Sequence, residues 1–183
     1  MFTDGRSKKV ALVAHCLLNQ NAISDGTAIH PCAHLEVVKT LLEAGVGILQ
    51  LPCPEFCCLG LDRGDPAGAQ RPVTVENTRI RRQLLLPENA QKLDALAEQA
   101  AGQVAEYLRH GFTVVGIIGA NRSPSCGVET TSDQGVELPG RGVFMEALCR
   151  ALERQGISLP CVGVKAGAQA AARVKALLEG QIE

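Results

Sequence analysis

Aromatic side chains are scarce in this sequence. They make up only 3% of its 183 residues, and Trp is absent. The core must therefore consist of Val, Leu, Ile and Ala. Hydrophobic residues at 46% and charged residues at 20% are the proportions of an ordinary globular protein. A chain of this length can bury one substantial core, so we expect a single domain over residues 1–183.

An excess of charge of one sign is also lacking. The formal net charge is -1 and the pI is near 6.4, so no overall positive field exists to gather nucleic acid. No apolar run approaches the roughly 18 residues that a membrane helix needs, and residues 1–6 contain no apolar core of a signal peptide. We therefore expect a cytoplasmic protein with neither a nucleic-acid nor a membrane partner.

The two common phosphate-binding loops are missing as well. Neither Gly-x-Gly-x-x-Gly nor Gly-x-x-x-x-Gly-Lys occurs in the chain. Because these loops bring backbone amides close to a phosphate, their absence makes a nucleotide-binding domain the weakest of the functional alternatives.

Short apolar segments alternate with helical patterns along the chain. The segments at residues 10–14, 46–51, 113–118 and 161–164 have the length and branching of buried strands. Helical spacing predicts one helix from Pro31 to Gly45, a long one from Asn89 to Gly111, and two more over residues 144–156 and around 174–178. The first of these has its apolar positions at Leu35, Val38, Leu41 and Leu42.

This alternation predicts an α/β fold. Strands that alternate with helices form βαβ units with right-handed crossovers. We expect a doubly wound, Rossmann-like or flavodoxin-like parallel sheet of about four strands with helices on both faces.

The segment from Pro52 to Pro87 has no clear period. It carries five arginines, namely Arg63, Arg71, Arg79, Arg81 and Arg82. Connections this long are usually functional or partly helical. For residues 59–87 the sequence leaves three alternatives: a surface that binds an anionic substrate, a contact with a second subunit in a homodimer, or arginines that are simply solvated.

Cysteine is the most informative residue of the composition. The chain has eight cysteines, and a cytosolic chain keeps its thiols reduced, so metal binding, catalysis or packing must account for them. Cys16, Cys53 and Cys126 each follow a predicted strand. Because the carboxyl ends of parallel strands share one edge of the sheet, where ligands bind, we expect these three to form one metal or catalytic site.

The other cysteines have different surroundings. Cys149 and Cys161 lie among apolar residues and are predicted to be core. Cys32 stands at a predicted helix start, where it is either reactive or, as we favour, packed. Cys57 and Cys58 follow Cys53 closely, and the sequence does not decide whether they accept sulfur, replace a ligand or line the pocket.

Three cysteines are one too few for structural zinc. Such sites use four ligands, usually in Cys-x-x-Cys pairs, and the chain has no such pair. An iron-sulfur cluster suits dispersed thiolates, and three cysteines on a 4Fe-4S cluster leave one iron open as a Lewis acid. The radical-type spacing Cys-x-x-x-Cys-x-x-Cys fails because Gly60 stands at its third position.

Three motifs carry a family resemblance: Cys16-Leu17-Leu18-Asn19, Pro52-Cys53-Pro54-Glu55 and Ser123-Pro124-Ser125-Cys126-Gly127. They resemble, in order, the cysteine motifs of the thiouracil desulfurase family. The resemblance implies a Rossmann-like domain whose 4Fe-4S cluster is held by Cys16, Cys53 and Cys126. It further implies an open iron that captures sulfur from a thiolated small molecule, such as a thiouracil-like nucleobase, by non-redox C–S cleavage.

The same resemblance assigns an acid-base pair, Glu55 and Ser123. Each has a plainer alternative: Glu55 as a solvated loop carboxylate or helix cap, and Ser123 as part of a turn. The dipeptide Asp25-Gly26 is first of all a tight turn. Of the histidines, His15 is a weak site candidate, whereas His30 and His34 are expected to cap or face the first helix. The alternative function is a non-catalytic iron-sulfur, sulfur-carrier or redox-sensing module.

Overall fold

Four parallel strands form the central sheet of the protein. The structure, a computed structural model, describes residues 2–182. In the order β2-β1-β3-β6 the sheet contains β2 (Gly47–Gln50), β1 (Lys9–Val13), β3 (Thr113–Ala120) and β6 (Cys161–Val164). Every neighbouring pair in this sheet is parallel. The predicted α/β class with a four-stranded parallel sheet is therefore confirmed.

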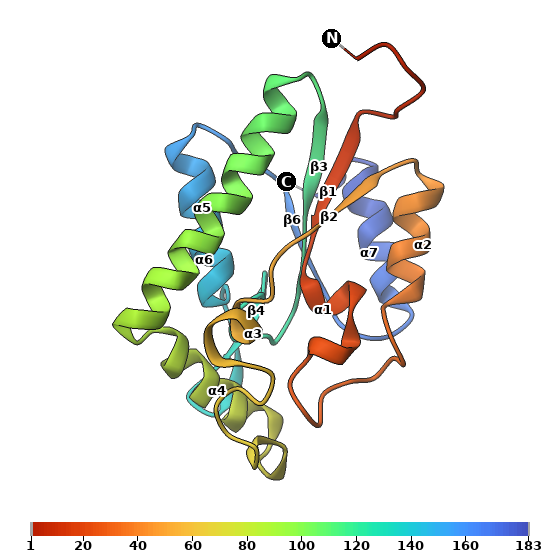
Figure 1. Cartoon of the computed structure of the whole chain (residues 1–183). Coiled ribbons are helices and arrows are strands. Elements are labelled where there is room, and N and C mark those ends of the chain that lie inside the picture. Colours follow the sequence, from red (N-terminus) through yellow and green to blue (C-terminus); the bar gives the residue numbers. More distant parts are fainter. Residues whose placement is uncertain (1, 183) are drawn as a thin grey trace.

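Helices cover both faces of this sheet. On one face α2 (Leu35–Glu43) packs against α7 (Gln169–Leu178), and on the other α5 (Pro87–Arg109) packs against α6 (Val143–Arg154), as Figure 1 shows. The strand β1 lies between two strands and two helical layers, so Ala11, Leu12 and Val13 are almost fully buried. This position explains why β1 is a continuous apolar run.

The strand order places a crevice at one end of the sheet. From β1 the chain first adds β2 on one side and later β3 on the other, and such a reversal leaves an opening at the carboxyl ends of the strands. Three helices gather at this end (Figure 1), namely α1 (His15–Leu18), α3 (Pro54–Leu59) and α4 (Val73–Leu84). One short 3-10 turn, Gln20–Ala22, follows α1, and another, Gly68–Gln70, lies between α3 and α4.

A bulge in β3 changes its register with β1. Val10 and Leu12 of β1 pair with Val114 and Ile117, so β3 contains one extra residue between the two pairs. Gly116 lies there with φ +149°, a conformation that residues with a side chain rarely adopt.

The helix α2 begins later than predicted. It starts at Leu35 rather than near Pro31, because the preceding residues are bonded to the segment after β1: His34 N donates to Leu17 O at 2.8 Å, and Gln20 N donates to Cys32 O at 2.6 Å. The predicted apolar face is also partly wrong. Leu35 and Leu42 are exposed, and the helix buries Val37 and Leu41.

The region between Pro52 and Pro87 proves to be partly helical, with α3 and α4. The sequence shows no apolar period for α4, because the buried positions of this helix include the polar residues Glu76, Asn77 and Thr78 as well as Ile80 and Leu84. A hairpin of β4 (Thr130–Asp133) and β5 (Val136–Pro139) was not predicted either. Its strands are short and polar, and its turn, Gln134-Gly135, has positive φ at both residues, as in a type I′ turn.

The long helix α5 agrees with the prediction to within two residues at its start. It buries Leu93, Ala97, Ala100 and Val104, and Gly111, with φ +74°, follows its end. Leu108, which the pattern placed on the buried face, is 38% exposed. Neither α5 nor any other helix within residues 2–182 is long and apolar enough to span a membrane.

Two glycine substitutions should affect stability in opposite directions. A Cβ at Gly142 would lie 2.4 Å from the carbonyl carbon and oxygen of Ser125, so we expect Gly142→Ala to destabilise the protein by about 1–3 kcal/mol. A Cβ at Gly102, on the exposed face of α5, meets nothing within 4 Å, and Gly102→Ala should stabilise by about 0.5–1 kcal/mol. Urea unfolding would measure both; a Gly142→Ala protein as stable as the wild type would contradict the packing described here.

Candidate functional site

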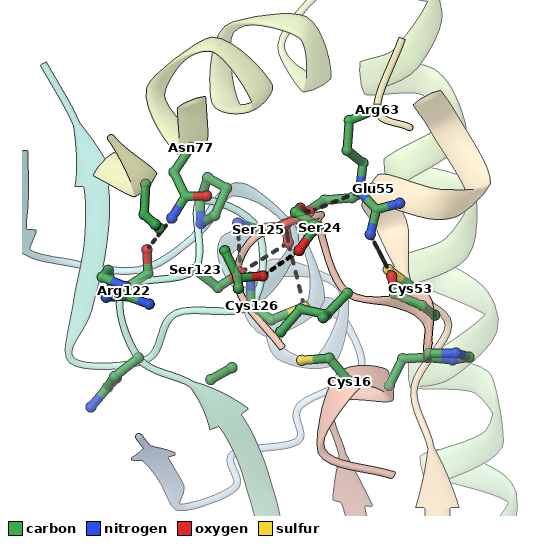
Figure 2. A pocket seen from close by; sticks show the side chains of 18 residues that line it. Cys16, Ser24, Cys53, Glu55, Arg63, Asn77, Arg122, Ser123, Ser125 and Cys126 are labelled. Atoms are coloured by element: carbon green, nitrogen blue, oxygen red, sulfur yellow. Dashed lines mark hydrogen bonds and ion pairs between the residues drawn. The ribbon is translucent and has the colours of Figure 1, made fainter. Parts of the chain in front are cut away.

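The three cysteines Cys16, Cys53 and Cys126 line one cavity at the carboxyl end of the sheet. Cys16 lies in α1 directly after β1, Cys53 precedes α3 after β2, and Cys126 follows β3. The cavity has a volume of about 90 Å³, and Figure 2 shows the three side chains around it. The structure thus brings together the trio that the sequence predicted. All three are free of disulfide bonds.

The turn that carries Cys126 is held by the start of α6. The first amides of a helix have no partner within the helix. Here the amide of Val143 donates to Pro124 O, and the amides of Phe144 and Met145 donate to Ser125 O, all at 3.0–3.1 Å. Because these bonds reach the two residues before Cys126, α6 fixes the position of that cysteine.

Cys53 is itself the cap of α3. Its Sγ accepts a hydrogen bond from Phe56 N at 3.5 Å, and Pro54 occupies the first turn, where a missing amide costs nothing. The guanidinium of Arg63 also donates to this sulfur, with Nη2 at 3.8 Å. Two donors therefore face the Cys53 sulfur.

The environment of the trio favours neutral thiols. Burial raises the pKa of Cys16 to about 12 and the pKa of Cys53 to about 11. Burial also raises the pKa of Cys126 well above its ordinary value. In all three cases the negative charge of Glu55 adds to the effect. A cationic group that binds here must displace the thiol protons, because only thiolates are good metal ligands.

The arrangement of the trio matters for the kind of metal it could hold. A single zinc ion needs its sulfur ligands about 2.3 Å from one point. Within residues 2–182 no three His, Cys, Asp or Glu side chains are grouped in that way. An iron-sulfur cluster makes a different demand, because each thiolate binds a separate iron. Three thiols from three separate segments around one cavity are a donor set of the kind that an iron-sulfur cluster uses.

Glu55 is buried in the wall of this cavity. Only 7% of the residue is exposed, so the alternative of a solvated loop carboxylate is wrong. Its Oε2 accepts hydrogen bonds from Ser24 Oγ and Arg63 Nε, both at 3.1 Å, and its Oε1 accepts one from Ser125 Oγ at 2.6 Å. Three donors from three separate segments therefore orient the carboxylate.

Ser123 also lines the cavity but does not contact Glu55 directly. Its Oγ lies 3.2 Å from Ser125 Oγ and accepts hydrogen bonds from the amides of Ser125 and Cys126. Ser125 gives its single hydroxyl proton to Glu55, so Ser123 must be the donor between the two serines. A directed chain runs from Ser123 through Ser125 to Glu55 (Figure 2).

Arg63 was not predicted as a site residue. It is 3% exposed, so for this arginine the alternative of a solvated surface is wrong. Besides Glu55 it donates to three carbonyl oxygens, those of Gly60, Leu61 and Ala22. Its φ of +56° is unusual for a residue with a side chain. The other arginines of the segment are less buried, and Arg71 and Arg79 pair with Glu76.

Sequence reasoning also missed Ser24, Asn77 and Ser125. Ser125 lies inside the third cysteine motif, which could have drawn attention to it. Asn77 stands at helical spacing from Ile80 and Leu84, so it is a polar residue on the buried face of α4, and such a residue is a useful signal. Nothing in the sequence around Ser24 marks it as part of the site.

Of the remaining candidates, only His15 lines the cavity. Its Nδ1 lies 2.9 Å from Gln50 Nε2, and burial lowers the pKa of this histidine. The Asp25-Gly26 dipeptide forms a tight turn between Ser24 and Thr27, and Asp25 does not line the cavity. His34 directly precedes α2 and its ring lies 4.4 Å from that of His30.

The extra cysteines near the site do not reach it. Cys57 is exposed and Cys58 is half-buried, with its Sγ donating to Asn89 O at 3.8 Å, and neither lines the cavity. The alternative that they line the pocket is therefore wrong. Cys32 is exposed in the loop before α2, so the expectation that it is packed is wrong as well.

Cys149 and Cys161 form a pair away from the cavity. Both are half-buried and pack against the hydrophobic core, as predicted. The neighbouring Cys161 thiol lowers the pKa of Cys149 to about 7, although burial opposes the change. The proximity of Cys149 in turn raises the pKa of Cys161, whose Sγ donates to Leu159 O at 3.5 Å.

Comparisons with known proteins add the following. No protein-family model matches the chain. It is 27% identical to an uncharacterized protein of Methanocaldococcus jannaschii over 157 residues, which is 86% of each chain. Among solved structures it is similar to the [4Fe-4S]-dependent thiouracil desulfidase TudS, with 22% identity, coverage of 93% of this chain and 99% of that one, and a TM-score of 0.45.

Removing the positive charge beside Glu55 should be costly. The substitution Arg63→Met leaves a buried carboxylate without its ion-pair partner, and we expect a loss of about 3–5 kcal/mol in the free energy of unfolding. Arg82→Met, at an exposed position of the same segment, should change it by less than about 0.5 kcal/mol. Combining Arg63→Met with Glu55→Gln should recover part of the loss in urea unfolding; no recovery would show that the two charges are not coupled.

Cys149 should react with thiol reagents at unusually low pH. Iodoacetamide attacks the thiolate, so the alkylation rate of Cys149 should rise through about pH 7, whereas an ordinary thiol responds near 9. Mass spectrometry of the labelled peptide against pH would measure this. In Cys161→Ala the profile should move to higher pH, because the neighbouring thiol that lowers the pKa of Cys149 is lost; an unchanged profile would contradict the assignment.

Proposed function

We propose that the protein is an iron-sulfur-dependent desulfidase that removes sulfur from a thiolated small molecule, such as a thiouracil-like nucleobase. The observation that carries the proposal is the cavity shared by Cys16, Cys53, Cys126 and the buried Glu55. Cysteines without a catalytic carboxylate would suit a storage module equally well. A buried carboxylate beside them suits proton transfer.

The three cysteines would hold the cluster. Their thiols are free of disulfides, line one cavity and come from three strand ends, which fits a 4Fe-4S cluster with three protein ligands. When bound there, such a cluster supplies a Lewis acid with an affinity for the sulfur of a C=S group. The other parts of the reaction fall to the residues of the chain.

Glu55 would act as the general base. An ionised carboxylate offers about four lone-pair positions, and Ser24, Arg63 and Ser125 occupy three of them. Because Glu55 lines the cavity, the remaining position is available to accept the proton of a water molecule there. Arg63 keeps the carboxylate in place by its ion pair, so the base needs no reorganisation during the reaction.

The overall change balances without an oxidant or a reductant. A water oxygen adds to the carbon of the C=S group, the carbon–sulfur bond breaks, and the products are a C=O group and hydrogen sulfide. Glu55 takes one proton from the water. The chain through Ser125 ends at Ser123 in the cavity wall. Once both hydroxyls turn so that Ser125 donates to Ser123 and Ser123 donates toward the departing sulfur, this proton can leave Glu55 along the chain. Glu55 and Ser123 thereby form the acid-base pair.

Anaerobic reconstitution followed by a sulfide-release assay on 2-thiouracil and 4-thiouracil tests the proposal. The wild type should show cluster absorption and release hydrosulfide, whereas Cys16→Ala should lose the cluster. In Glu55→Gln the absorption should persist while turnover falls by about 100-fold or more, because the base is gone. The matched control is Cys57→Ser, at an exposed position outside the cavity, which should keep both.

Two outcomes would contradict this function. A wild type without cluster absorption after reconstitution would remove its basis. A wild type that binds the cluster but releases no sulfide from any thiolated base would favour the non-catalytic module. Full activity in Glu55→Gln would leave the desulfidase in place but overturn the role of the carboxylate.

A further inference from the structure

The amide of Asn77 has a fixed orientation. Its Nδ2 lies 3.3 Å from Arg122 O and 3.2 Å from Ser132 Oγ. A carbonyl oxygen can only accept, and Ser132 uses its own proton to donate to that same carbonyl at 2.7 Å. Both neighbours are therefore acceptors, and only the NH₂ group of Asn77 can face them.

The amide oxygen consequently faces the other way. Figure 2 shows the nitrogen of Asn77 turned toward Arg122 and its oxygen on the side of Ser125 and Ser24. Asn77 lines the same cavity as the three cysteines and is only 7% exposed. Among residues 2–182 no side chain or backbone amide donates to this Oδ1. Within residues 2–182 no fully buried side-chain oxygen or nitrogen lacks a partner, so this oxygen is open to the cavity and accepts from whatever occupies it, water or a ligand.

We propose that Asn77 is a specificity-determining residue that accepts a hydrogen bond from a ring N–H of the substrate. This inference rests on the proposed function and narrows its substrate class to thiolactams, in which an N–H adjoins the C=S carbon. In such a ring the N–H and the sulfur are fixed side by side. A small rigid molecule can therefore place its sulfur toward the cysteines and its N–H toward Asn77 within one cavity.

The charge of the site favours an N–H donor over a cation. Glu55, the carboxylate of the cavity wall, is already paired with Arg63, and a second cation, Arg122, also lines the cavity. The charged side chains therefore disfavour a cationic ligand. The oxygen that Asn77 presents is neutral, so it can accept from a neutral lactam, and it rejects a ring that has an acceptor at the same position, because two acceptors would then face each other.

A pair of rings of equal size tests this inference. The compound 2-pyridone carries an N–H where 2-pyranone carries a ring oxygen, and both have a C=O in place of the C=S. Their dissociation constants are measured by ligand-observed NMR titration with the anaerobically reconstituted protein. The wild type should bind 2-pyridone about 10- to 100-fold more tightly than 2-pyranone, because the lactone leaves the amide oxygen unpaired.

The variant Asn77→Leu should abolish this preference. Leucine has nearly the same shape but no acceptor, so the ratio of the two constants should fall to about one. The matched control is Thr78→Val, at the next position of α4. Thr78 is buried and bonded to Thr74 O and Gly135 N but does not line the cavity. It should lower the thermal unfolding midpoint without changing the ratio. If Asn77→Leu does not fold, Asn77→Ser, which is too short to reach the ligand, takes its place.

The results separate this inference from the proposed function. Equal binding of the two rings by the wild type, no saturable binding of 2-pyridone, or an unchanged preference in the Asn77 variant would each overturn the inference, whatever happens to thiouracil. Conversely, a wild type that prefers 2-pyridone but releases no sulfide from 2-thiouracil would refute the desulfidase. The role of Asn77 in recognising a ring N–H would then stand as a binding property.

Discussion

The buried ion pair between Glu55 and Arg63 organises the site. Through hydrogen bonds to Ser24, Ala22 and Ser125, this pair joins the loop after β1, the segment around α3 and the turn after β3. These are the segments that carry the three cysteines. Because a buried charge without its partner is strongly unfavourable, any displacement of one segment disturbs the others. The positions of the three sulfur atoms thus depend on the ion pair between Glu55 and Arg63, which is formed by a carboxylate and a guanidinium and not by the cysteines themselves.

The parts of the site divide into two kinds of environment. The cysteines lie in surroundings that favour neutral thiols, whereas the carboxylate beside them is held by an arginine and two hydroxyl groups. A bound cation is needed to ionise the three thiols, whereas the fold itself supplies the hydrogen-bond donors of the Glu55 carboxylate. Under the proposed function, this separation would give the cavity one side for metal binding and one side for proton transfer, the combination that hydrolytic removal of sulfur requires.

The predicted and unpredicted features differ in their physical origin. The four strands, the long helix and the meeting of Cys16, Cys53 and Cys126 follow from apolar periodicity and from the rule that parallel strands end at one edge. The burial of Arg63 could not be predicted, because it depends on the carbonyl of Ala22, a residue 41 positions earlier in the chain. The late start of α2 likewise depends on bonds to Leu17 and Gln20. The single-domain, homodimer and cytoplasmic expectations stay predictions.

The wide spacing of the three cysteines has a consequence for how the protein matures. Each cysteine follows a different strand, so no short peptide contains two of them in position. In an unfolded chain, bringing the cysteines together would close long loops and lose conformational entropy. Formation of the sheet brings the three cysteines together and so offsets this loss. A zinc finger folds because its metal binds. Under the proposed function we expect the reverse order here: the cluster would be inserted into a protein that has already folded.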